Sequence, residues 1–130
     1  MEEGNDEENY NKNNLNSLLR KYLMKNSKID AAAIVSAEGL PIITSFSDRL
    51  NNKVISSMTA TLFSLTNMAI NELKLGDFNE LYIKGKNGYL IILQAGENAV
   101  LIVSTKIKVQ LGVILFKCKQ LCNNIARLLE

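Results

Sequence analysis

Residues 52–75 carry the strongest hydrophobic pattern in the chain, a helical pattern with two apolar stripes. At about 100° per residue, one stripe consists of Val54, Met58, Leu62, Leu65, Met68, Ala69 and Leu73. The second, beside it, consists of Ile55, Thr59, Phe63, Thr66 and Ile70. Together they cover roughly 200° of arc, whereas a surface helix typically needs only about 100° or a little more. We expect the first stripe to cover a sheet of its own chain and the second to bind another surface, which points to self-association.

Shorter periodic segments predict the remaining elements. A leucine-rich stripe predicts a first helix over residues 14–26, and a longer apolar face predicts a last helix over residues 109–130. Apolar runs between turn residues predict five strands, at residues 31–36, 40–46, 78–84, 89–94 and 99–104. Asn87-Gly88 is the strongest hairpin signal, and Gly76 is a natural end for the long helix. The connection into that helix is expected to begin at Ser47 or Asp48.

The resulting order, α-β-β-α-β-β-β-α, predicts an α/β sandwich with a five-stranded, mainly antiparallel sheet. The long helix should cover one face and the two terminal helices the other. Near-continuous apolar runs at residues 90–93 and 101–103 indicate that the middle of the sheet is covered on both faces. Residues 1–13, rich in Asn and Glu, have too little apolar surface to fold and are predicted to form a disordered acidic tail. Residues 14–130 would then form one domain.

Candidate catalytic chemistry is sparse. The chain contains no histidine, which removes the commonest general base and metal ligand. Cys118 and Cys122, four residues apart on the last helix, are expected to be buried thiols in a reducing compartment rather than a metal pair or a disulfide. Glu72, Asp77 and Glu80 surround a helix end, where capping and solvent exposure explain them better than acid–base work. We therefore expect no enzyme activity, catalytic residue, cofactor or metal.

Charge and hydropathy narrow the choice of partners. The net charge is +2, but residues 1–13 hold five of the thirteen acidic side chains, so the rest of the chain is basic. That excess permits an alternative function as a nucleic-acid-associated protein. Because the lysines are dispersed without interleaved aromatic residues, a solvated surface explains them better, and nucleic acid is not the expected partner. Without a basic-then-apolar leader or an apolar run of about 18 residues, we expect a cytoplasmic protein that does not insert into membranes.

Several short motifs occur in an order that is similar to a known family. They are Ile-Val-Ser-Ala-Glu-Gly-Leu-Pro-Ile at residues 34–42, Leu-Lys-Leu-Gly at 73–76, Leu-Tyr-Ile-Lys-Gly at 81–85, Gly88-Tyr89 and Leu111-Gly112. With the order of elements, they make residues 14–130 resemble the roadblock (dynein light chain) domain family, including its bacterial and archaeal MglB-type members. The resemblance implies a non-enzymatic homodimer, joined at the edge strand and the middle helix, that binds and regulates a Ras-like small GTPase. Some relatives stimulate GTP hydrolysis, so a GTPase-activating or scaffold role is implied, with a motor or cargo adaptor subunit as the alternative.

Two sets of residues are the candidate sites. The expected dimer interface combines the second stripe with an edge strand and consists of Ile55, Thr59, Phe63, Thr66, Ile70, Leu81, Tyr82 and Ile83. The expected partner-binding surface is a small, uncharged arc of the long helix: Ser56, Ala60, Ser64, Asn67 and Asn71. Small residues permit close approach of a partner, although Ser and Asn could equally be solvated polar residues. On this interpretation, Ala60→Arg would abolish partner binding and leave the dimer intact.

Overall fold

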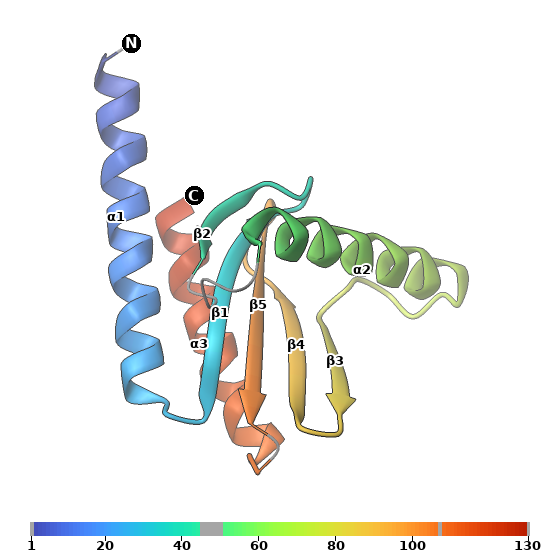
Figure 1. Cartoon of the computed structure of the whole chain (residues 1–130). Coiled ribbons are helices and arrows are strands. Elements are labelled where there is room, and N and C mark those ends of the chain that lie inside the picture. The colour runs from blue at the N-terminus through green and yellow to red at the C-terminus, as the bar shows by residue number, and fades with distance from the viewer. Residues whose placement is uncertain (1, 45–50, 107, 130) are drawn as a thin grey trace.

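The computed structural model describes residues 2–44, 51–106 and 108–129 and has the predicted order of elements. In chain order these are α1 (Glu2–Lys25), β1 (Ile29–Ser36), β2 (Pro41–Thr44), α2 (Asn52–Glu72), β3 (Glu80–Gly85), β4 (Gly88–Gln94), β5 (Ala99–Lys106) and α3 (Leu111–Leu129). The α/β class and the five-stranded sheet are confirmed (Figure 1). None of the helices in the described part of the chain is long and apolar enough to cross a membrane.

The five strands form one sheet in the order β2-β1-β5-β4-β3, with every neighbouring pair antiparallel. The register places Ile34 of β1 opposite Leu101 of β5, and Ile102 of β5 opposite Ile92 of β4. The strand expected at residues 78–84 is β3, and it lies at one edge of the sheet, as predicted. The other edge is the short strand β2, which starts at Pro41.

The three central strands are buried on both faces, as their continuous apolar runs predicted. Alternate residues point to opposite faces of a strand. On β5, Leu101 and Val103 pack with α1 and α3, whereas Val100 and Ile102 pack beneath α2. The first core also holds Leu15, Leu19, Cys118, Leu121 and Ile125 of the terminal helices. The helices are therefore divided between the faces as expected, with α2 alone on its side.

The first helix begins at Glu2, twelve residues earlier than predicted, and so includes residues 2–13, for which the sequence predicted a disordered tail. In Figure 1 this half of α1 projects past the sheet. Residues 2–13 have too few apolar side chains to form a hydrophobic core of their own. As the extension of a helix that is already packed on the sheet, they do not need one. Once Leu15 and Leu19 fix the helix on the sheet, each added residue requires only propagation, without a new nucleus.

The end of α2 also differs from the prediction. The helix stops at Glu72, and the cap is a Schellman motif in which Leu75 N–H donates to Ile70 O and Lys74 N–H donates to Asn71 O. Lys74, not Gly76, takes the left-handed cap position, with φ of 55°. The start of the connection at Ser47 or Asp48 and the last two residues of the expected second strand lie outside the described residues.

The β3–β4 hairpin is present, but its turn is shifted by one residue. Gly85 pairs with Gly88, so Lys86 and Asn87 form the two-residue loop in place of Asn87-Gly88. Gly88 has a different role, because a Cβ at this position would overlap the carbonyl oxygen of Thr105 on β5. The glycine is required for close approach of two strands and not for the turn.

Candidate partner interface

The two apolar stripes of α2 are used in the opposite way to the prediction. Ile55 and Thr59, expected at a dimer interface, are buried within their own chain. Phe63 and Ile70 pack on the same buried cluster, and Phe63 meets Phe78 edge to face, with ring centroids 5.0 Å apart. The second stripe therefore covers the sheet.

The threonines explain why this mixed stripe can face a core. The Thr59 hydroxyl donates to Ile55 O at 2.7 Å, and the Thr66 hydroxyl donates to Leu62 O at 2.7 Å. A side chain that bonds to the backbone of the preceding turn needs no partner in the sheet. Only its methyl group then faces the apolar layer, so burial leaves no polar group unsatisfied.

The first stripe, expected to cover the sheet, faces outward instead. We call its large exposed side chains within α2 the outer apolar stripe: Val54, Met58, Leu65 and Met68. Ala69 and Leu73 are exposed as well. Leu65 is 58% exposed and Met68 is 65% exposed, although both are large apolar side chains. Leu62 is an exception and packs partly against the core below α2. The two methionines were a signal in the sequence, because flexible thioether side chains are common at adaptable binding surfaces.

The edge strand β3 lies next to this helix. In Figure 1 the C-terminal half of α2 extends beyond the β3 edge of the sheet. Tyr82 and Ile83 are 47% and 42% exposed, while Leu81 packs partly into the core beneath α2. An edge strand presents backbone N–H and C=O groups that no strand of the same sheet satisfies. Apolar side chains and unpaired backbone groups thus occur together on one border of the molecule.

The β1–β2 turn of the same chain packs against the first two residues of the small polar arc of α2. Ser56 is fully buried, and its hydroxyl has no hydrogen-bond partner among the described residues. Ala60 lies against the β1–β2 turn, where a Cβ on Gly39 would come within 3.2 Å of the Ala60 Cβ. These two residues are small because their own chain approaches closely. Ser56 is therefore closed to a partner, whereas Ala60 is partly exposed and lines the hollow described below, and Ala60→Arg would disturb the turn as well as any partner.

The rest of the arc remains accessible. Ser64 and Asn71 are exposed and Asn67 is half-buried. Ser64 borders a shallow hollow of about 390 Å³ between the β1–β2 turn and α2, which Ala37 and Leu65 also line. The sequence could not indicate this hollow, because the residues that form it come from segments distant along the chain.

The hydroxyl and thiol groups buried between the sheet and the terminal helices α1 and α3 are unreactive near neutral pH. The Tyr22 hydroxyl donates to Cys118 Sγ at 3.5 Å, and burial raises the pKa of both groups. Burial, and then the neighbouring Cys118, raises the pKa of Cys122 to about 12. Both thiols are therefore protonated near neutral pH, and a protonated thiol is a poor nucleophile and metal ligand. In residues 2–44, 51–106 and 108–129, no three Cys, Asp or Glu side chains gather as a metal site would need.

The three carboxylates that lie close together in sequence near the end of α2 do not form one cluster in the structure. Glu72 and Asp77 are exposed, whereas Glu80 on β3 pairs with Lys119 on α3, with Nζ 3.1 Å from Oε2. This ion pair joins the edge strand to the helix layer below it. Because Lys119 is mostly exposed, its contribution to stability is small.

Comparisons with known proteins agree with this architecture. The protein MJ0310 of Methanocaldococcus jannaschii is 26% identical over 103 residues, which cover 79% of this chain and 90% of that protein. Among solved structures, Myxococcus xanthus MglB has a TM-score of 0.83 at 15% identity, with 91% of this chain and 89% of that chain covered. An MglB structure with a tetrameric arrangement has a TM-score of 0.79 at 17% identity, with the same coverage.

The family assignment rests on sequence as well as on fold. The sequence model of the Roadblock/LC7 domain matches residues 15–105, which is more than half of the chain and extends from the first buried leucine of α1 to the end of β5. The chain therefore belongs to the Roadblock/LC7 domain family.

Proposed function

We propose that this protein is a homodimeric, non-enzymatic platform that binds and regulates a Ras-like small GTPase. The observation that supports it best is the outer apolar stripe of α2 beside the unpaired edge of β3. Exposed apolar side chains that form a continuous patch commonly mark an interaction site. Family membership and the self-association of an MglB of similar fold support the same proposal.

In the proposed dimer, two β3 strands pair across a two-fold axis and the two α2 helices lie side by side. Antiparallel pairing would satisfy the free backbone groups of β3. Leu65 and Met68 would be covered by the same stripe of the partner, as a two-fold interface requires. Each large apolar side chain buried in this way contributes about 1.5–3 kcal/mol before ordering costs. Tyr82 and Ile83 remain in the proposed interface, whereas Ile55 and Thr59 are no longer part of it.

The GTPase would bind over the accessible part of the polar arc. Ser64, Asn67 and Asn71 are uncharged, so a partner could approach without removing water from ions. The hollow beside Ser64 offers a shape into which a side chain of the partner could fit. Binding there in one nucleotide state would shift the GTPase toward that state, and this differential binding is the proposed regulation.

Light scattering on the purified protein tests the dimer. We expect twice the mass of one chain at micromolar concentration, and the mass of a single chain for Leu65→Asp, which places a charge in the apolar stripe. A parent protein that is monomeric under these conditions would contradict the proposed dimer.

Partner binding is tested with a purified Ras-like GTPase of the same organism, loaded with GDP or with a non-hydrolysable GTP analogue. We expect binding that depends on the nucleotide, is lost in Ser64→Arg and persists in the matched control Ser17→Arg on α1. Equal loss in both variants, or binding that ignores the nucleotide, would contradict the proposed site. The rate of GTP hydrolysis with and without the dimer distinguishes an activating role from a scaffold role.

A further inference from the structure

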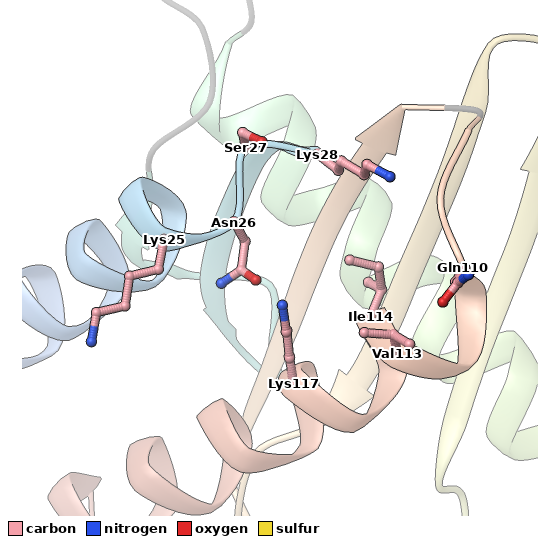
Figure 2. A pocket seen from close by; sticks show the side chains of 8 residues that line it. All are labelled: Lys25, Asn26, Ser27, Lys28, Gln110, Val113, Ile114 and Lys117. Atoms are coloured by element: carbon pink, nitrogen blue, oxygen red, sulfur yellow. The ribbon is translucent and has the colours of Figure 1, made fainter.

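A second hollow, of about 250 Å³, lies on the opposite side of the sheet from α2, between the end of α1 and the start of α3 (Figure 2). Three lysines line it: Lys25 at the end of α1, Lys28 just before β1, and Lys117 on α3. Figure 2 shows Lys25 and Lys28 to either side of Asn26, with the Lys117 side chain pointing toward Asn26 from α3. The Lys25 and Lys28 side chains extend away from Asn26 in opposite directions (Figure 2), so three segments of the chain place lysines around one opening without bringing their ammonium groups together.

No negative charge compensates these lysines within the described structure. None of the residues that line the hollow is acidic, and none of the three lysines forms an ion pair with a described residue. A neighbouring hollow of about 210 Å³ between α1 and α3 shares Lys25 and Lys117, adds Lys21, and is also lined without an acidic residue. The first turn of α3 contains no acidic side chain either. The positive potential of this region is therefore available to an external anion.

The backbone that carries the lysines is held in place without a ligand. Asn26 is 8% exposed, and its Nδ2 donates to Tyr22 O at 2.8 Å. Ile29 N–H donates to Asn26 O at 3.0 Å, and Lys106 N–H donates to Lys28 O at 3.0 Å. The turn between α1 and β1 is thus tied to both α1 and β5. Binding would require ordering of the lysine side chains and not of the chain that bears them.

We propose that this hollow binds the phosphate group of a phosphorylated ligand. A phosphate has three strong acceptor oxygens and up to two negative charges, so it can bind several ammonium donors at once. A single carboxylate would leave most of the lysine charge uncompensated. The hollow has about eight times the volume that one water occupies in the liquid, enough for a phosphate and part of the attached group. The site is separate from the proposed dimer and GTPase surfaces and does not depend on them.

The phosphate could belong to a soluble compound or to a lipid headgroup. Met24 and Phe116, which neighbour Lys25 and Lys117 in the chain, are 85% and 63% exposed. Exposed apolar side chains on the same two helices are available to contact the bilayer boundary if the phosphate is carried by a lipid. The hollow would bind the phosphate group in the same way in both cases. A soluble phosphate compound and a lipid vesicle, used as separate probes, distinguish the two sources.

Calorimetric titration with inorganic pyrophosphate tests the soluble source. We expect one saturable site per chain. Lys28→Gln with Lys117→Gln should weaken binding by about tenfold or more, since each removes a charge-assisted contact. The matched control, Lys53→Gln with Lys86→Gln, removes the same charge from outside the hollow and should change affinity by less than about twofold. Backbone amide NMR shifts on titration should be concentrated at Ser27, Lys28 and Gln110.

Sedimentation with phosphatidylcholine vesicles, with and without a phosphorylated inositol lipid, tests the membrane source. Binding that needs the phosphorylated lipid and is lost in the hollow variant but not in the control supports the proposal and assigns a lipid source. Pyrophosphate binding with the same dependence, without vesicle binding, supports it and assigns a soluble source. If neither probe binds, or if the hollow variant and its control lose binding equally, the proposal is wrong.

Discussion

Lys74 is the residue whose backbone conformation is least expected from its side chain. Its φ of 55° lies in the left-handed region, where the Cβ of a non-glycine residue is crowded. The conformation persists because the Schellman motif uses it to satisfy carbonyl groups of Ile70 and Asn71 at the end of α2. The cap thus stabilises the helix end, while the lysine side chain makes the cap less favourable than a glycine would.

Replacing this lysine by glycine should make the protein more stable. We expect Lys74→Gly to raise the free energy of unfolding by up to about 1 kcal/mol, because relief of the left-handed strain exceeds the added entropy of the unfolded chain. Urea denaturation provides the measurement, with Lys74→Ala as the control that removes the charge but keeps the Cβ. Equal stability of the two variants would show that the backbone conformation carries no strain.

Cys122 should make stability fall in alkaline solution. Its pKa is raised from 9.0 to about 12, so below pH 9 the thiol is protonated in both the folded and the unfolded state. Above pH 9 the unfolded chain releases the proton that the folded protein keeps, and the free energy of unfolding decreases until about pH 12. One such group contributes a slope of up to about 1.4 kcal/mol per pH unit. Urea denaturation across this range should show a shallower slope for Cys122→Ala, and identical slopes would contradict the assignment.

At the scale of elements, α2 has two apolar faces with different roles. The inner face packs on the sheet through Ile55, Thr59 and Phe63. On the outer face, Val54 and Leu65 are exposed to solvent in the single chain. Adjacent positions such as 54 and 55 differ by about 100° on a helix and therefore lie on different faces. This adjacency provides a matched pair of substitutions.

Ile55→Ala should destabilise the fold and Val54→Ala should not. Truncation of a buried Ile costs about 2–5 kcal/mol because it leaves a cavity, whereas a surface change away from special features stays within about 0.5 kcal/mol. Both should be measured by urea denaturation in the Leu65→Asp background, so that self-association does not contribute. The reverse ranking would mean that the first stripe, and not the second, covers the sheet.

At the scale of the whole molecule, self-association should be visible in thermal stability. If folding and dimerisation are linked, Tm rises with protein concentration by mass action. We expect such a rise between about 1 and about 100 µM for the parent protein. Leu65→Asp should melt at a lower temperature that does not change with concentration, and the control Ser17→Asp should behave as the parent. A concentration-independent Tm in the parent would contradict a dimer that stabilises the fold.

The alternation of apolar residues determined most of the architecture. Continuous apolar runs such as residues 90–93 predicted central strands covered on both faces, and the helical pattern of residues 52–75 predicted a long helix with two apolar faces. These inferences succeed because each period is a local property of the backbone geometry. The absence of histidine, likewise readable from the sequence, removes the commonest general base and favours binding over catalysis.

Only the tertiary structure decided which side of α2 faces inward and which small residues remain available to a partner. Thr59 could join the core because its hydroxyl donates to Ile55 O, and Ser56 is buried where the turn at Gly39 approaches α2. The cluster of Lys25, Lys28 and Lys117 was equally hidden, since these residues are dispersed in sequence. A helical period fixes the angle between two stripes but not the rotation of the helix on its sheet, which depends on contacts between segments far apart in the chain.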